Sequence, residues 1–211
     1  RLTLAISIFS NRHPKKFLYQ LVSGQLDMDR LDYLNRDSFF TGVSEGVIGY
    51  DRIIKMLAVH DGELVVEEKG IYSIEKFLIA RRLMYWQVYL HKTGVSAEQM
   101  LIHTLKRARE LTLEGINLEV PRHLAWFLKN EKRDGLEPTE SLFHFALLDD
   151  NDVTAAIKYW TEAQDFTLSF LSKGLLDRQL FRLEWFNKPI PAEYVDEIRR
   201  RVENTFGEKA I

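Results

Sequence analysis

A run of acidic, basic and tyrosine side chains between residues 23 and 42 has the composition and spacing of part of a metal-phosphate site. At about 100° per residue, Asp29, Tyr33 and Asp37 fall on one side of a helix, and Arg30 lies beside them. Other positions of the same helix supply apolar contacts, namely Leu26, Leu31 and Leu34. We therefore predict a helix in which a polar stripe adjoins a stripe that faces the core.

The ends of this helix follow from local rules. Asp27 can cap its start through a side-chain oxygen, and Gly42 can end it in a left-handed backbone conformation. Acids in the first turn also suit the positive end of the helix dipole. On spacing alone, a capped helix with a solvated charged face explains Asp27, Asp29 and Asp32 without any function.

A second polar stripe lies on the helix that we predict for residues 73–93. Arg81, Tyr85, Tyr89 and Lys92 recur at i, i+4, i+8 and i+11, within a narrow arc. Apolar residues occupy the opposite side, namely Ile79, Leu83, Trp86 and Leu90. The alternative interpretation is an amphipathic helix with its cations in water and its tyrosines at the rim of the core.

The order of residues in SGQLDMDRLDYLNRDSFFTGV, residues 23–43, resembles the distal motif of the HD-domain metal-dependent phosphohydrolases. The similarity is greatest to the deoxynucleoside triphosphate triphosphohydrolase (dGTPase-like) branch. It implies that Asp29 is the last ligand of a divalent metal ion and that Arg30 contacts phosphate. It also implies that Tyr33 and Asp37 contact the sugar end of the nucleotide. The residue types suit these roles, because carboxylates bind hard cations and arginine forks onto phosphate oxygens.

The 73–93 helix resembles the helix of that family that carries an Arg and then a Tyr-x-His-Lys sequence. The resemblance implies that Arg81, Tyr89 and Lys92 reach the triphosphate and the sugar, and that His91 is a further substrate-binding candidate. Tyr85 has no counterpart in that motif and rests on the stripe alone.

If both helices line one pocket, the cations of the second helix lie close to the acids of the first. We then expect Arg81 and Lys92 to face Asp29 and Asp37, which balance their charge until a nucleotide arrives.

The other metal ligands of an HD enzyme are not recognisable in this sequence. Such an enzyme needs a His and then a His-Asp pair upstream of the distal Asp, because its metal takes imidazole and carboxylate ligands together. Only His13 precedes Asp29, and His60-Asp61 comes after it, where His-Asp-Gly indicates a hairpin turn. We expect a chain that starts at Arg1 to be the C-terminal portion of a longer protein, and not to complete the metal centre alone. The metal is left open among magnesium, manganese, iron, nickel and zinc.

Composition excludes several classes of protein. With 211 residues, 45% of them hydrophobic, the chain can bury a sizeable core in one or two domains. The absence of cysteine excludes disulfides and thiolate metal ligands and fits a cytoplasmic location. The formal net charge of -2 gives no global field that would attract nucleic acid. The apolar run at residues 2–9 is too short to span a membrane.

We predict an all-α fold with one small β-hairpin across Asp61-Gly62. The expected helices cover residues 14–22, 26–40, 73–93, 96–111, 140–148 and 153–163. The expected caps of the last three are Ser96 with Gln99 in a capping box, Thr139, and Asp152 or Asn151. Ten aromatic residues of the second half are expected to belong to the core and not to stack on ligands, namely Trp126, Phe127, Phe143, Phe145, Trp160, Phe166, Phe170, Phe181, Trp185 and Phe186.

The resemblance divides the chain into residues 1–111, the C-terminal part of an HD phosphohydrolase core, and residues 112–211, a helical extension. The resemblance implies that the parent protein hydrolyses a deoxynucleoside triphosphate to deoxynucleoside and triphosphate, and no catalytic residue is assigned. We also expect a homo-oligomer. Two alternatives are an HD phosphohydrolase that acts on another phosphoester and a non-catalytic helical module for assembly or regulation.

Overall fold

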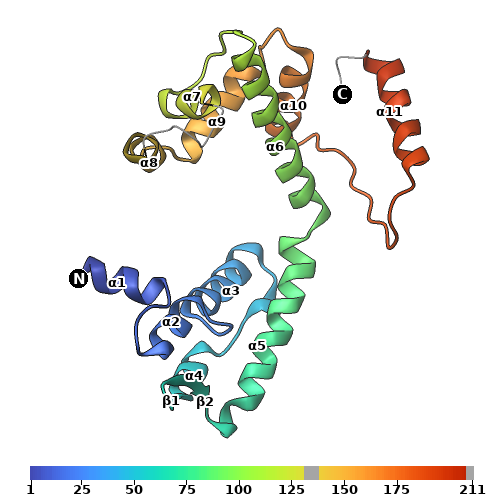
Figure 1. The fold of residues 1–211 in the computed structure, drawn as a ribbon. Coiled ribbons are helices and arrows are strands. Elements are labelled where there is room, and N and C mark those ends of the chain that lie inside the picture. The colour runs from blue at the N-terminus through green and yellow to red at the C-terminus, as the bar shows by residue number, and fades with distance from the viewer. Residues whose placement is uncertain (131–137, 208–211) are drawn as a thin grey trace. The chain divides into compact units, whose positions relative to one another are not determined.

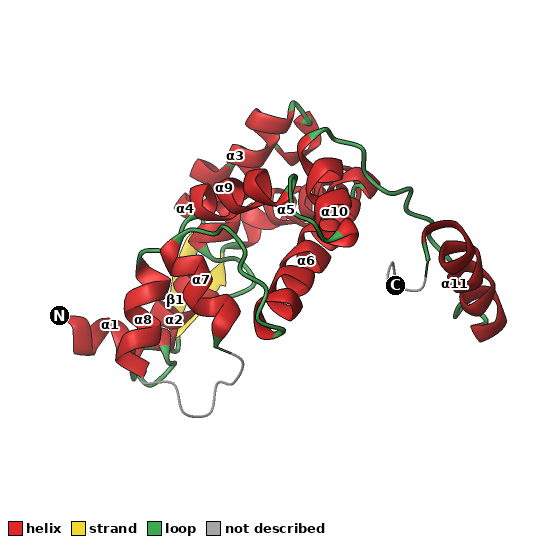
Figure 2. Cartoon of the chain, turned by 90° about the horizontal axis from the view of Figure 1, so that it is seen from above, coloured by secondary structure: helices red, strands yellow, loops and turns green. Residues whose placement is uncertain are grey.

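A computed structural model describes residues 1–130 and 138–207 (Figure 1). Within these residues all regular elements are helical except one two-stranded antiparallel sheet, the yellow hairpin of Figure 2. The prediction of an all-α fold with one small hairpin is confirmed. The chain forms two compact units, Arg1–His91 and Lys92–Ile211. The assignment of residues 1–111 to an HD core and of 112–211 to an extension stays a prediction.

The elements of the first unit are, in chain order, α1 (Leu2–Phe9), α2 (Lys16–Ser23), α3 (Met28–Thr41), η1 (Ser44–Gly46), α4 (Tyr50–Lys55), β1 (Leu57–His60), β2 (Glu63–Val66), η2 (Glu68–Gly70), α5 (Ile71–Met84) and η3 (Tyr85–Tyr89). The core of this unit is formed mainly by α3, α4 and α5. Its buried side chains are Leu31, Leu34, Ile48, Ile53, Phe77, Ala80 and Met84. The apolar stripe predicted beside the motif therefore does face a core.

Local signals set the ends of α3 and the turn of the hairpin. The Asp27 side chain accepts a hydrogen bond from the backbone N–H of Arg30 at 2.8 Å, and Gly42 ends the helix with φ 72°. In the hairpin, Asp61 has φ 49° and Gly62 has φ 80°, as a two-residue turn with two positive φ angles requires. The cap, the helix end and the turn were all predicted.

The single helix predicted for residues 73–93 is wrong. The α-helix α5 ends at Met84 and continues as a π-helical turn, η3, in which the backbone N–H of Leu90 donates to the carbonyl of Tyr85 at 2.8 Å. Leu90 then leaves helical geometry with φ -104° and ψ 19°. The next helix begins at Lys92, so the predicted stripe is divided between two helices and two units.

The elements of the second unit are α6 (Lys92–Leu113), α7 (Arg122–Lys129), α8 (Pro138–Ala146), α9 (Asp150–Trp160), α10 (Phe166–Leu176) and α11 (Ala192–Phe206). Its main core joins α6, α7, α9 and α10. The buried side chains are Ala108, Leu111, Leu124, Leu128, Ala156, Ile157, Trp160 and Leu168.

Three predicted caps in this unit are wrong. Ser96 lies inside α6, is buried, and donates its hydroxyl to the carbonyl of Phe181 at 2.6 Å, so it does not cap a helix with Gln99. Thr139 lies inside α8. The start of α9 is capped by Asp149, whose capping box uses Asp152 as the third helical residue. For Ser96 the reason is a tertiary contact with Phe181, whereas α9 begins at Asp150, earlier than expected, so its cap is Asp149.

Candidate functional site

The helix α3 carries the four motif residues of the first unit, and they differ in exposure. Asp29 lies exposed in the first turn, whereas Arg30, Tyr33 and Asp37 are half-buried. Within the described ranges, Asp29 makes no hydrogen bond or ion pair with another side chain. Its carboxylate is therefore accessible to a ligand.

Arg30 is held in place by groups at the start of its own helix. Its Nη1 donates to Asp27 Oδ2 at 2.6 Å and also to the carbonyl of Gly24. Asp27 is 5% exposed, so this ion pair is largely shielded from water. The sequence identified Asp27 as a cap but gave no sign that it also pairs with the Arg30 side chain.

The central contact of the site joins α3 to the π-turn. The hydroxyl of Tyr89 donates to Asp37 Oδ2 at 2.8 Å, and the rings of Tyr33 and Tyr89 meet edge to face with centroids 5.9 Å apart. Burial raises the pKa of Tyr89, and the hydrogen bond to Asp37 raises it further. Tyr89 therefore stays a neutral donor. Its contact with Asp37 joins the two segments in which the sequence predicted site residues.

Arg81 lies beside this contact. Its guanidinium is 5.8 Å from the centroid of the Tyr85 ring, and the Tyr85 and Tyr89 rings are 5.2 Å apart. Burial raises the pKa of Tyr33, an effect that the charges of Arg81 and Arg30 partly oppose. Both arginines are thus close enough to act on the tyrosine cluster electrostatically. Tyr85, which the stripe alone suggested, belongs to the same group.

The expected balance of Arg81 by the acids of α3 is wrong for the described residues. No ion pair connects Arg81 with Asp29 or Asp37, and Arg81 instead contacts an aromatic ring. The physical reason is that Asp37 accepts from Tyr89, a neutral partner. His91 is exposed at the end of the first unit. Lys92 is exposed at the start of the second unit, and its approach to Asp29 stays a prediction.

The described residues do not by themselves fit a catalytic metal ion. Nowhere in residues 1–130 and 138–207 do three side chains of the ligand types His, Asp or Glu gather around a common point. Asp29 offers one carboxylate, which cannot fix the geometry of a metal. The arrangement is instead suited to holding an organic phosphate, because it combines two arginines, a carboxylate and aromatic rings.

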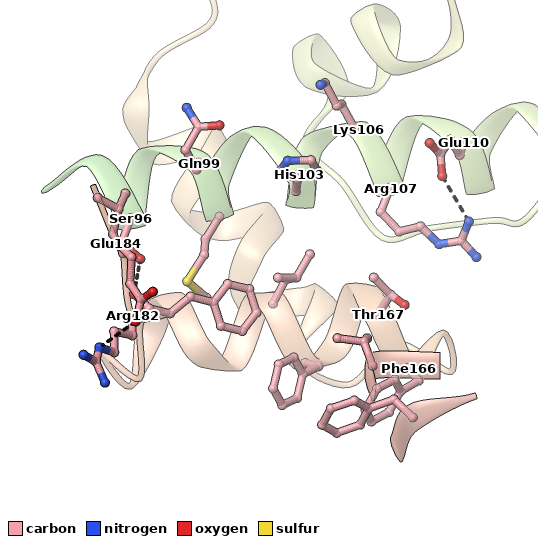
Figure 3. Close-up of a pocket in the computed structure, with 17 residues that line it drawn as sticks. Ser96, Gln99, His103, Lys106, Arg107, Glu110, Phe166, Thr167, Arg182 and Glu184 are labelled. Atoms are coloured by element: carbon pink, nitrogen blue, oxygen red, sulfur yellow. Dashed lines mark hydrogen bonds and ion pairs between the residues drawn. The ribbon is translucent and has the colours of Figure 1, made fainter. Parts of the chain in front are cut away.

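A different kind of site lies in the second unit, in a cavity of about 880 Å³ between α6, α10, α11 and residues 181–184 (Figure 3). Its wall contains stacked phenylalanine rings: Phe166 and Phe170 have centroids 5.6 Å apart, and Phe206 lies 5.9 Å from Phe166. Phe166 is 53% exposed and Phe170 is 43% exposed, so their expected assignment to the core is wrong. The i, i+4 spacing of Phe166 and Phe170 is the sequence feature that indicates that their rings lie together on one face of the helix.

Comparisons with known proteins found one family model and several similar proteins. Residues 48–119 match the family model described as the HD associated region. A crystal structure of a phosphohydrolase from Bacteroides thetaiotaomicron is similar to 99% of this chain with a TM-score of 0.94 and 52% identity. The uncharacterized protein YwfO of Bacillus subtilis is 32% identical over 181 residues, which is 85% of this chain. A Dictyostelium discoideum protein described as a homolog of the deoxynucleoside triphosphate triphosphohydrolase SAMHD1 is 30% identical over 122 residues.

The chain spans only part of each of these proteins: 53% of the Bacteroides chain, 40% of the Bacillus protein and 24% of the Dictyostelium protein. None of the described helices is both long and apolar enough to cross a membrane. Residues 48–119 thus resemble the HD associated region, and the chain shares its fold with part of a phosphohydrolase.

Proposed function

We propose that this chain forms the substrate-facing portion of an HD phosphohydrolase that cleaves a deoxynucleoside triphosphate to deoxynucleoside and triphosphate. The observation that carries the proposal is the hydrogen bond between Tyr89 and Asp37, which are 52 residues apart in sequence. It brings together the two segments that resemble the dGTPase-like branch. A surface formed by chance from two amphipathic helices has no reason to pair these two residues.

The chemistry of the cluster suits the sugar end of a nucleotide. A carboxylate can accept several hydrogen bonds, so Asp37 can accept one from a sugar hydroxyl as well as one from Tyr89. The edge-to-face rings of Tyr33 and Tyr89 offer an apolar surface to the carbon face of the sugar. In this proposal the three residues together position the deoxynucleoside.

The phosphates in this proposal are bound by Arg30 and Arg81, with Lys92 and His91 added by resemblance. Cations that are held in place before substrate arrives stabilise the charge that builds on phosphate oxygens during hydrolysis. A bound divalent metal would supply an activated water, and Asp29 is the residue of this chain that would bind it. Its other ligands belong, in this proposal, to the length of the relatives that this chain does not span. We also propose a cytoplasmic homo-oligomer.

The test is product identification with the full-length protein and each of the four common deoxynucleoside triphosphates. We expect intact triphosphate and deoxynucleoside in equal amounts. Release of pyrophosphate or of single phosphates would assign a different bond to the enzyme. Faster turnover of another phosphoester would favour the second HD class, and no turnover of any phosphoester would favour a non-catalytic module.

The matched control is the present chain, residues 1–211, under the same conditions. It should turn over no deoxynucleoside triphosphate, because one recognisable metal ligand cannot hold a catalytic metal. Turnover by this chain, with contaminants excluded, would contradict the assignment of Asp29 as one ligand among several.

A further inference from the structure

Two hydrogen bonds fix the orientation of the Arg30 side chain, and both use the same nitrogen. Nη1 donates to Asp27 Oδ2 at 2.6 Å and to the carbonyl of Gly24. The Asp27 side chain is only 7% exposed, while the Arg30 side chain is 26% exposed. A largely buried carboxylate thus holds one corner of a guanidinium whose remainder reaches the surface.

The other two nitrogens of Arg30 have no hydrogen-bond partner in the described part of the chain. Nε and Nη2 form the side of the guanidinium that can donate two parallel hydrogen bonds to one phosphate or carboxylate. Because Nη1 is anchored, this side has a fixed direction before any ligand binds. Prior orientation of a charged donor lowers the entropy cost of binding.

The position of Gly24 is also fixed, and by packing. A Cβ atom at this residue would lie 2.3 Å from the carbonyl oxygen of Gln20, so a larger side chain would force the backbone to move. The backbone N–H of Gly24 donates to that same carbonyl at 2.9 Å. The carbonyl that receives Arg30 is therefore part of a tight end to α2.

We propose that Asp27 is a positioning residue that aims the Nε and Nη2 side of Arg30 at a phosphate group of the substrate. The proposal rests on the proposed function and adds to it a residue to which neither the motif resemblance nor the comparisons give a role. Asp27 acts through Arg30 and does not touch the substrate. Its second task, capping α3 through Oδ1, is separable, because serine also caps helices but carries no charge.

The experiment measures binding of inorganic tripolyphosphate to the full-length protein by calorimetry. Asp27→Ser should keep the helix cap and the fold while weakening binding by roughly tenfold, the usual effect of losing a charge-assisted interaction. Arg30→Ala should weaken binding by a similar factor. In the Arg30→Ala background, Asp27→Ser should have no further effect, since the two residues act as one unit.

A matched control replaces the corresponding cap in the second unit. Asp149→Ser changes an Asp that caps α9 in the same way but contacts no arginine side chain in the described residues, so binding should be unchanged. Asp27→Asn, which keeps the side-chain volume, covers the case in which Asp27→Ser does not fold, and should also weaken binding.

Three results would overturn the proposal: unchanged binding in Asp27→Ser and Asp27→Asn, an equal loss from Asp27→Ser with and without Arg30, or no binding of tripolyphosphate by the unmodified protein. Failure of the proposed function is recognised separately. If the protein hydrolyses no deoxynucleoside triphosphate but the binding pattern holds, the positioning role of Asp27 stands and the reaction has to be reassigned.

Discussion

The two units use their aromatic residues in opposite ways. In the first, Tyr33 and Tyr89 are half-buried, and the hydroxyl of Tyr89 is bound by a carboxylate, so its ring is held by a directional bond. In the second, Phe166, Phe170 and Phe206 stack with exposed faces and have no polar tip to hold. The first arrangement can select a ligand by hydrogen bonds, whereas the second can select only by shape and apolar area.

Arg30 of the first unit and Arg107 of the second differ in how many of their nitrogens are hydrogen-bonded. Arg107 in α6 donates through Nε and Nη2 to Asp165, at 3.2 and 2.8 Å, and through Nη1 to Glu110 at 3.0 Å. All three nitrogens are occupied, and the hydrogen bond to Asp165 raises the pKa of the guanidinium above its usual value. Arg107 therefore connects α6 with the start of α10. Arg30, with two nitrogens left over, is the one suited to bind a ligand.

The largest expected effect tests whether the units are independent. Phe77 and Trp160 are each 1% exposed and lie in different cores. Replacing either by Ala should cost about 3 to 5 kcal/mol, because a large cavity remains. Hydrogen exchange should show lost protection in residues 1–91 for Phe77→Ala and in residues 92–211 for Trp160→Ala. Equal loss across the whole chain would show that the two units unfold as one.

The next effect is on activity. Asp29→Ala in the full-length protein should lower turnover by roughly 100-fold or more and reduce the metal content, if Asp29 binds metal as the resemblance implies. The melting temperature should hardly change, because Asp29 is exposed. Asp32→Ala is the control, since Asp32 is an exposed acid of the same helix that pairs with Arg36. Normal activity and metal content in Asp29→Ala would remove this assignment.

A smaller effect concerns the contact between Tyr89 and Asp37. Tyr89→Phe keeps the ring but removes the 2.8 Å hydrogen bond, so the free energy of unfolding of the first unit should fall by about 1 kcal/mol. Denaturant unfolding measures this. Ser169→Ala is a comparison in the second unit, where a side-chain hydroxyl donates to the carbonyl of Thr161 at 2.7 Å. If Tyr89→Phe were as stable as the wild type, water would replace the hydrogen bond without loss of free energy of unfolding.

The smallest effect appears at high pH. Burial, followed by the bond to Asp37, raises the pKa of Tyr89 above its ordinary value of 10.0. A raised pKa means that the folded state holds the proton more tightly than the unfolded state, so this stabilisation is complete below pH 10.0 and is lost as the pH rises towards the folded value. Stability measured between neutral and alkaline pH should decline less steeply in Tyr89→Phe. Tyr33, whose pKa is also raised, should leave part of the decline.

The features that the sequence predicted correctly are set by a few neighbouring residues. Asp27 caps α3, and the Asp61-Gly62 turn needs only its own backbone angles. The features that it missed depend on partners far away in the chain. Ser96 has the sequence context of a cap, yet its hydroxyl is bound by Phe181, 85 residues later.

The candidate site shows the same limit. Family resemblance chose Tyr89 and Asp37, and the structure brings them together. Helical spacing did not reveal the π-turn that orients Tyr89, because no glycine or proline marks residues 85–89. The side-chain pairing of Asp27 with Arg30 was also missed, since it depends on how the backbone enters the helix at Gly24.

The π-turn has a consequence for how this segment can change in length. A π-helical turn holds one more residue than an α-helical turn, so all residues after it are shifted in phase around the axis by about 100°. Deleting one residue between Met84 and Tyr89 would restore a regular α-helix and rotate Tyr89 away from α3. A point substitution in this segment changes the chemistry of one side chain, whereas a single deletion would change the direction in which Tyr89 points. We therefore expect length variation among relatives to be rare between Arg81 and Tyr89.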